Sequence, residues 1–285
     1  MQNTVFITDS ACDLKPEFLS NLGFKVINLN YAFEKSEIEK DLTIKQFYDY
    51  MRGGQVAKTT AINPDTFLNV FREELKNGND VFYIAFSSGL STTYNSANIA
   101  KSELAEEFPE RKIIIVDSLA ASAGQGLFVY LVANKINECK TIEELESYAE
   151  NLKLNICHWF TVDDLVYLKR GGRVSPAVAF VGGVLGIKPI LHVDNEGHLI
   201  NVSKRRGRKA AISALAEKFE ETAKDIKNGT IFISHGDCIE DAQTLAKIIK
   251  SKHNVEVKLI TDIGPVIGAH SGPGTLALFF VGNER

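Results

Sequence analysis

Short, almost wholly apolar runs alternate with longer segments of helical spacing along the first half of the chain. The runs VFYIAF and IIIVD, at residues 81–86 and 113–117, have the composition of strands whose two faces are both covered. Strands are predicted at residues 4–10, 25–30, 80–88 and 112–118. Helices are predicted at residues 15–22, 43–51, 64–77, 91–108 and 120–137. This alternation predicts an α/β fold with a doubly wound parallel sheet.

The second half of the chain has a different order of elements. A turn signal at residues 194–197 (DNEG) separates two strand-like runs and predicts a hairpin. A long amphipathic helix at 208–227 is followed by further strands and by a helix at 239–253. We therefore expect two tightly packed lobes, a parallel α/β lobe over residues 1–154 and a mixed-sheet α/β lobe over residues 155–285.

Charge and hydropathy exclude several classes of protein. The 285 residues carry a formal net charge of −4 with a pI near 5.9, which disfavours nucleic acid as a partner. The longest uncharged stretch, residues 174–187, is shorter than the roughly twenty apolar residues of a membrane-spanning helix. We expect it to line a pocket. The first residues carry no secretion signal, so the chain is expected to be a soluble cytoplasmic protein.

Metal and nucleotide signatures are missing from the sequence. The four cysteines, at positions 12, 139, 157 and 238, are scattered without a C-x-x-C pair, which is typical of reduced thiols. There is no H-E-x-x-H sequence and no phosphate-cradling glycine motif. The sequence therefore predicts neither a metal site nor a nucleotide cofactor.

Small hydroxyl side chains gather where predicted strands end. They form four groups: Thr8 and Ser10 around Asp9, Thr59-Thr60, residues 87–92 (SSGLST), and Asp117-Ser118. Ligands of open parallel sheets bind at the carboxyl ends of the strands, and a serine near a helix start, such as Ser91, can help to bind an anion. The alternative is ordinary helix capping. Clustering at four strand ends favours a binding site.

Two further segments could carry chemistry. Ser91 lies in Gly89-Leu90-Ser91-Thr92-Thr93, an incomplete nucleophile elbow because Thr93 replaces the second glycine. Residues 264–274 contain four glycines and two prolines around His270, and we interpret them as a tightly fixed loop that presents His270 and Ser271.

Two basic clusters stand out in an acidic chain. Residues 169–173 (KRGGR) end a helix-like segment, and residues 204–209 (KRRGRK) hold five positive charges next to a helix start. Positive charge is unfavourable at a helix start, and no internal acidic partner is evident in the sequence. The second cluster is therefore interpreted as a docking face for an acidic partner protein.

Taken in order, these motifs resemble the DegV family over essentially the whole chain. The resemblance is carried by Thr8-Asp9-Ser10, Lys58-Thr59-Thr60, Ser87-Ser88-Gly89-Leu90-Ser91, Val116-Asp117-Ser118, residues 168–173 (LKRGGR), residues 188–191 (KPIL), and Gly264-Pro265 with His270 and residues 272–274 (GPG). Members of the family bind fatty acids. Those of the FakB type present the bound acid to the catalytic subunit of a fatty acid kinase, which phosphorylates the carboxylate.

The resemblance implies a two-lobed DegV-type fold, a long-chain fatty acid as ligand, no cofactor and no catalytic residue of the chain's own. It implies carboxylate contacts from Thr59, Thr60, Ser91, Thr92 and His270. It places Gly89, Arg170 and Ser271 near the head group, and kinase docking at Arg205, Arg206 and Arg208. A transient contact with a membrane surface is compatible with this role.

Two departures from the family pattern bear on ligand preference. Ala61 stands where the family commonly has glutamine, and Thr92 where it commonly has glycine. Because the head-group contacts are neutral hydroxyls and a histidine, we expect the carboxylate to be bound without an arginine clamp. Such a carboxylate would stay nucleophilic enough to be phosphorylated.

Two enzymatic alternatives stay open. One is an acyl-ester hydrolase that uses Ser91, His270 and an acid such as Asp9. The other is a small-molecule phosphotransferase that carries phosphate on His270.

Overall fold

The computed structural model describes residues 3–35, 42–174 and 186–285. Its first sheet has the strand order β2 (Phe24–Ile27), β1 (Thr4–Asp9), β5 (Asp80–Ala85), β6 (Ile113–Asp117). All of its neighbours are parallel. The predicted parallel sheet is therefore confirmed.

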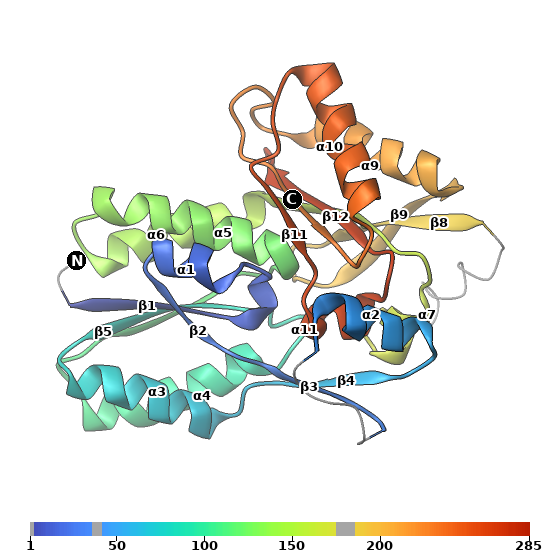
Figure 1. The fold of residues 1–285 in the computed structure, drawn as a ribbon. Helices are drawn as coiled ribbons and strands as arrows, with labels where there is room; N and C mark the ends of the chain where they lie inside the picture. Colours follow the sequence, from blue (N-terminus) through green and yellow to red (C-terminus); the bar gives the residue numbers. More distant parts are fainter. Residues whose placement is uncertain (1–2, 36–41, 175–185) are drawn as a thin grey trace.

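Helices cover both faces of this sheet, as the nearly all-apolar strands require. In Figure 1, α3 (Pro64–Lys76) and α4 (Thr93–Glu107) lie below it. Above it lie α1 (Pro16–Asn21), α5 (Ser122–Lys135) and α6 (Ile142–Leu152). Asn63 caps α3, because its side chain accepts a hydrogen bond from the backbone N–H of Thr66.

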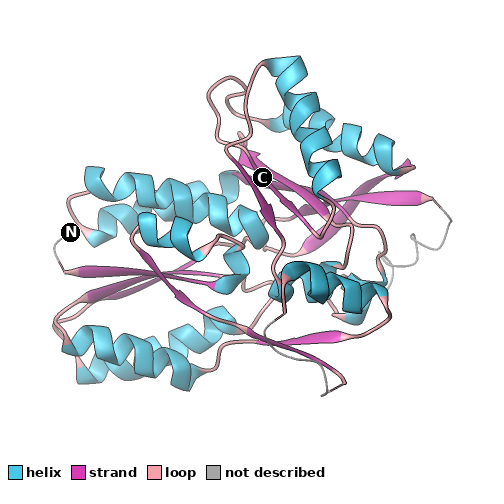
Figure 2. Ribbon diagram, viewed as in Figure 1, coloured by secondary structure: helices cyan, strands magenta, loops and turns pink. Residues whose placement is uncertain are grey.

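The second sheet is mixed, as predicted. Its order is β11 (Leu259–Asp262), β10 (Phe232–His235), β12 (Leu276–Val281), β7 (Ile156–Thr161), β8 (Ile187–Val193), β9 (Leu199–Arg206). Only β10 and β11 run parallel among these neighbours. Two helices, α9 (Arg208–Thr222) and α10 (Ile239–His253), lie on its outer side (Figure 2).

The strand pair of a small third unit was not predicted, whereas its helix was predicted at residues 43–51. Strands β3 (Asn30–Phe33) and β4 (Ala57–Thr60) pair in antiparallel fashion, and α2 (Ile44–Arg52) follows β3 in the chain. These strands are short, and their sequences, NYAF and AKTT, contain no continuous apolar run. The remaining short helices are α7 (Val166–Arg170), α11 (Pro265–Ser271), η1 (Ser10–Cys12), η2 (Ile136–Glu138) and η3 (Lys153–Asn155).

The interpretation of residues 264–274 as a loop is wrong for their first part. Residues Pro265–Ser271 form helix α11, with Pro265 at its first turn, where a missing N–H costs nothing. Gly268 allows the helix to approach Tyr48 of α2, because a Cβ there would lie 2.5 Å from the Tyr48 hydroxyl. His270 is thus held in the last turn of a packed helix rather than on a loop.

One of the buried hydrophobic clusters spans both sheets. The strands of the parallel sheet precede residue 155 and those of the mixed sheet follow it. Helix α5 packs between them, and its Leu127 belongs to a buried cluster that includes Phe82 of the first sheet and Phe279 of the second. A helix that is apolar on nearly every side is expected to be buried in this way.

Arg285 ties the lobes together at one edge of their junction. Its guanidinium donates hydrogen bonds to the carbonyls of Leu119 (2.7 Å) and Ile156 (3.1 Å), and also to that of Asp194 (3.1 Å). Burial lowers the pKa of this guanidinium to about 10.

Within the described parts of the chain, no helix has the length and apolar character to cross a membrane. Most of the uncharged stretch predicted to line a pocket, residues 175–185, lies outside the described residues.

Candidate functional site

A cavity of about 500 Å³ lies between the lobes, within the range of small-molecule pockets. Most of its wall is apolar, and its polar side chains come from both lobes. Its apolar lining comes from Leu29, Ala61, Phe86, Leu90, Ala121, Phe160, Leu168, Val193, Leu199, Ile263, Val266, Ile267, Ala277 and Phe279. Its polar lining comes from Thr59, Ser88, Ser91, Thr92, Ser122, His158, Arg173, His270, Ser271 and Thr275.

Thr59 and His270 meet on the cavity wall. The Thr59 Oγ1 lies 2.7 Å from the His270 Nε2, although β4 and α11 are far apart in the sequence. Burial, and next the positive charge of Arg173, lower the pKa of His270 to about 4. The imidazole is therefore neutral near pH 7. A proton on Nε2 would be donated to Thr59, which leaves the Thr59 hydroxyl hydrogen free for a ligand.

Ser91 lies just before α4. Its Oγ accepts a hydrogen bond from the backbone N–H of Thr93 (3.2 Å) and lies 2.9 Å from the Thr93 Oγ1. Thr93 in turn accepts from the backbone N–H of Ile62 (3.4 Å), which ties the end of β4 to the start of α4. If the Thr93 hydroxyl donates to Ser91, the Ser91 proton is available to an anion in the cavity.

The loop that carries Ser91 is pressed against the second lobe. The Ser87 Oγ donates to the carbonyl of Gly197 at 3.0 Å, at the turn of the β8–β9 hairpin. A Cβ on Gly89 would lie 2.7 Å from the carbonyl oxygen of Glu196. Glycine at position 89 is therefore required by the close approach of two backbones.

Arg173 is a site residue that the sequence reasoning missed. Its Nε and Nη2 donate to the carbonyl of Leu90 at 3.2 and 3.0 Å, and its side chain lines the cavity. Arg173 belongs to the basic cluster at residues 169–173. The cluster was noticed in the sequence, but Arg170 rather than Arg173 was predicted to lie near the head group. The expectation that the carboxylate is bound without an arginine clamp stays a prediction. Because two guanidinium nitrogens already bond Leu90, this arginine is not free to clamp a ligand in bidentate fashion.

The other predicted head-group residues fall into two sets. Thr92 and Ser271 line the cavity together with Gly89. Thr60 is exposed at the end of β4, and Arg170 is exposed with its guanidinium 5.8 Å from the Tyr167 ring; neither lines the cavity. Strand alternation explains Thr60, because it points to the face opposite Thr59.

The hydrolase alternative loses its third member in this geometry. Asp9 is fully buried, where it accepts hydrogen bonds from the Tyr83 hydroxyl (2.7 Å) and the Phe86 backbone N–H (2.9 Å). The partner of His270 is Thr59, not a carboxylate. Several strand-end hydroxyls are likewise structural, since Thr8 and Ser118 donate to backbone carbonyls of the parallel sheet.

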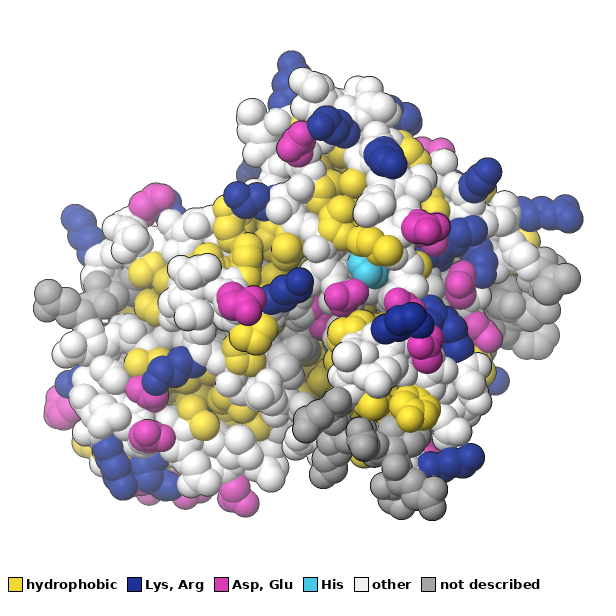
Figure 3. Space-filling model, viewed as in Figure 1, with side chains coloured by type: hydrophobic (Ala, Val, Ile, Leu, Met, Phe, Trp, Pro, Cys, Tyr) yellow, Lys and Arg dark blue, Asp and Glu magenta, His cyan; other side chains and the backbone are white. Residues whose placement is uncertain are grey.

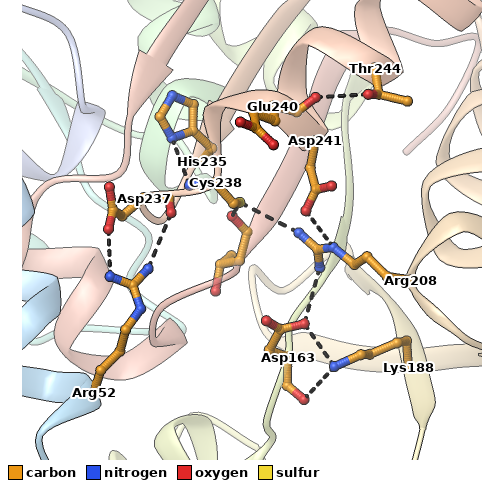
Figure 4. Close-up of polar contacts among 11 residues, drawn as sticks. Arg52, Asp163, Lys188, Arg208, His235, Asp237, Cys238, Glu240, Asp241 and Thr244 are labelled. Atoms are coloured by element: carbon orange, nitrogen blue, oxygen red, sulfur yellow. Dashed lines mark hydrogen bonds and ion pairs between the residues drawn. The ribbon is translucent and has the colours of Figure 1, made fainter.

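The predicted docking cluster divides into paired and unpaired arginines. Arg208 is half-buried and bonds Asp241 at 2.8 Å, with Asp163 at 3.5 Å, as Figure 4 shows. Arg205 lies 3.6 Å from Glu217. The expectation of no internal acidic partner is therefore wrong for these two residues. Arg206 is exposed on β9 and has no ion pair with the described residues.

Figure 3 shows basic and acidic side chains interspersed on one face of the molecule, with hydrophobic side chains gathered where α5 meets the second lobe. A smaller cavity of about 290 Å³ lies beside the ion pairs of Figure 4, and its lining includes Arg52 and Asp237, which pair at 2.5 Å.

One group of potential metal ligands was not predicted. Asp194, Glu196 and His198 bring ligand atoms within 4.8 Å of one another on the β8–β9 turn. The Asp194 carboxylate accepts the backbone N–H groups of both other residues, so its position follows from the turn itself.

Comparison with known sequences identifies the family. The profile described as "Uncharacterised protein, DegV family" matches residues 3–283. A DegV domain-containing protein of Clostridium perfringens is 43% identical over 289 residues, which cover 100% of this chain and 99% of the relative.

Comparison with solved structures agrees over the same length. A fatty-acid-binding DegV family protein of Thermus thermophilus has a TM-score of 0.86 and 30% identity, covering 99% of this chain and 100% of that one. A stearic acid-binding protein of Eubacterium ventriosum has a TM-score of 0.87 and 25% identity, covering 98% of each chain. This chain belongs to the DegV family.

Proposed function

We propose that this protein binds one long-chain fatty acid, with the carboxylate at Thr59, Ser91 and His270. The observation that carries the proposal is the lining of the cavity, in which Thr59, Ser91 and His270, from three distant segments, share one largely apolar space. Solved DegV structures that bind fatty acids support it through the shared fold.

The energetics fit such a ligand. Burial of a methylene group contributes about 0.8 kcal/mol, so a long acyl chain supplies most of the affinity. The Thr59 and Ser91 hydroxyls can donate hydrogen bonds to the carboxylate, while the neutral imidazole of His270 orients the Thr59 hydroxyl through Nε2. The Arg173 guanidinium adds a favourable positive potential while it remains bonded to Leu90.

Binding of palmitate to delipidated protein tests this function. Hexadecanol is the matched control, because it has the same chain length without the carboxylate. We expect palmitate to bind more tightly than hexadecanol. Absence of palmitate binding would contradict the proposal, and equal binding of both ligands would contradict the head-group site.

We further propose that the bound acid is presented to the catalytic subunit of a fatty acid kinase. Arg206 supports this role, because it is an exposed cation on β9, which is an edge strand of the six-stranded sheet. Exposed charges at the rim of an interface mainly affect association rate and its salt dependence. A transient contact of this protein with a membrane surface stays a prediction.

Acyl phosphate formation with the kinase subunit and ATP tests the presentation step. Arg206→Ala should slow the reaction, with a smaller defect at high salt, and should leave the content of bound acid unchanged. Lys76→Ala, an exposed substitution on α3, is the control. Unaltered kinetics in Arg206→Ala would show that this face does not dock the kinase.

A further inference from the structure

Asp13 is a buried carboxylate at the contact between the two lobes. It directly follows η1, at the end of the first strand of the parallel sheet. Its Oδ1 accepts a hydrogen bond from the backbone N–H of Gly264 (2.9 Å), and its backbone carbonyl accepts one from the Thr261 hydroxyl (3.1 Å). Both donors belong to the second lobe. Asp13 therefore joins the first lobe to the segment that leads from β11 into α11.

The segment held by Asp13 carries the head-group site at its other end. Gly264 is the N-cap residue of α11, and His270 lies in the last turn of that helix. At about 1.5 Å per residue, His270 is roughly 9 Å along the helix from Gly264. A Cβ on Gly264 would lie 2.9 Å from the Asp13 Oδ1, so the carboxylate is in close contact with the helix start. A displacement of this end of α11 would move the His270 imidazole with it.

The other carboxylate oxygen of Asp13 lies behind the cavity wall. The Ser122 hydroxyl donates to Oδ2 at 2.5 Å, and Ser122 lines the cavity. The Ser234 Oγ lies 2.9 Å from the Ser122 Oγ. When Asp13 is ionised, Ser122 donates to it and Ser234 donates to Ser122. When Asp13 is protonated, it can donate to Ser122, which then donates to Ser234. The hydrogen-bonded chain thus accommodates both states of the carboxyl group.

The charges around Asp13 do not stabilise its ionised form. Among the residues that the structure describes, no cation forms an ion pair with it, and the charged group that faces it is the carboxylate of Asp262 on β11. The Tyr48 hydroxyl of α2 and the Cys12 thiol of η1 also face it, and both are neutral because burial raises their pKa values. Burial raises the pKa of Asp13 to about 7, its hydrogen bonds oppose this rise, and Asp262 adds to it. Near neutral pH both protonation states are therefore present.

We propose that Asp13 is a positioning residue of the head-group site, which anchors α11 and its His270 and takes up a proton from solvent when a fatty-acid carboxylate binds. The proton uptake follows from Coulomb repulsion, because a carboxylate at His270 would lie roughly 10 Å from a second buried anion. A neutral Asp13 removes the repulsion and keeps its hydrogen bond from Gly264. The inference rests on the proposed fatty-acid function and adds to it a residue behind the cavity wall.

The affinity for palmitate at pH 6 and pH 8 tests the proton uptake. Asp13→Asn keeps an acceptor for the Gly264 N–H but cannot ionise. Asp65→Asn, which removes an exposed carboxylate on α3, is the matched control. Titration of the ligand itself affects all proteins equally. From pH 6 to pH 8 the Kd of the wild type and of the control should rise roughly 3- to 10-fold more than that of Asp13→Asn, as expected for like charges about 10 Å apart at an effective dielectric constant near 20.

Asp13→Ala tests the anchor, because it leaves the Gly264 N–H without its acceptor. At pH 6 we expect its Kd for palmitate to exceed that of Asp13→Asn by roughly 5-fold or more. Thermal denaturation shows whether Asp13→Ala folds; if it does not, the pH comparison decides alone. Equal pH dependence in the wild type and Asp13→Asn would overturn the inference, as would wild-type affinity in folded Asp13→Ala. If palmitate does not bind to the wild type, the proposed function fails instead.

Discussion

The Thr59 Oγ1 and the His270 Nε2 lie 2.7 Å apart, although 211 positions separate the two residues in the chain. One comes from the short β3–β4 sheet and the other from the last turn of α11. Each limits the hydrogen-bonding choices of the other, so the polar end of the cavity is preorganised before a ligand arrives.

Removal of either partner should weaken fatty-acid binding. Thr59→Ala or His270→Ala leaves a buried polar group unpaired, which costs about 1–3 kcal/mol, or roughly a 5- to 150-fold rise in Kd. Thr60→Ala is the matched control, because Thr60 is exposed on the opposite face of β4. Titration of palmitate into the three delipidated variants checks this, and a Thr60→Ala defect as large as that of Thr59→Ala would count against the assignment.

Ser91→Ala should weaken palmitate binding and should not reveal an esterase. The wild type is expected to show no ester turnover that depends on Ser91, because His270 bonds Thr59 and Asp9 is bonded to Tyr83 and Phe86. Hydrolysis of a chromogenic acyl ester by both proteins measures this. Turnover by the wild type that is lost in Ser91→Ala would restore the hydrolase interpretation.

Arg206 and Arg208 should behave differently on substitution. Arg208→Ala removes a half-buried guanidinium from Asp241 and Asp163, and we expect a loss of about 1–3 kcal/mol in the free energy of unfolding. Arg206→Ala should change the free energy of unfolding by less than about 0.5 kcal/mol. Urea denaturation of both variants makes the comparison, and equal stability losses would show that Arg206 also has a structural role.

The buried His270 should make stability depend on pH. Its folded pKa is about 4, whereas an unfolded histidine titrates near 6.5. The unfolded chain therefore binds the proton first, and the stability contributed by this residue falls as pH drops from about 6.5 toward 4.

His270→Asn isolates that contribution. Between pH 7 and pH 5 the variant should lose about 1–2 kcal/mol less stability than the wild type. Asp13, whose pKa burial raises to about 7, acts in the opposite direction but is present in both proteins. Denaturant titrations at the two pH values give the difference, and parallel losses would show that His270 is not held neutral.

Most of the fold could be predicted because the central strands of its two larger sheets are apolar. Strands β1, β5 and β6 are apolar on both faces. Such strands are typical of a parallel sheet covered by helices on both sides, which is how the parallel direction could be predicted. Strands β3 (NYAF) and β4 (AKTT) have four residues each and no continuous apolar run, so the sequence does not distinguish them from loops. Helix α11 was missed for a related reason, since its glycines and proline are typical of a loop.

The site could be predicted only in part. Ser91 follows from the rule that ligands bind at the carboxyl ends of parallel strands, whereas Thr59 lies on the antiparallel β3–β4 sheet, which that rule does not cover. Arg173 bonds the carbonyl of Leu90, 83 positions away. The partner of Arg208, Asp241, lies 33 positions away on another helix. No local pattern encodes such contacts. They arise when the two lobes pack together.

The most direct test of the account is native mass spectrometry of protein purified from bacteria, compared with its denatured mass. We expect the native mass to exceed the denatured mass by one long-chain fatty acid, and organic extraction to yield that acid. A native mass equal to the denatured mass, together with no binding of added palmitate or oleate, would contradict the claim that the cavity between the lobes is a fatty-acid site.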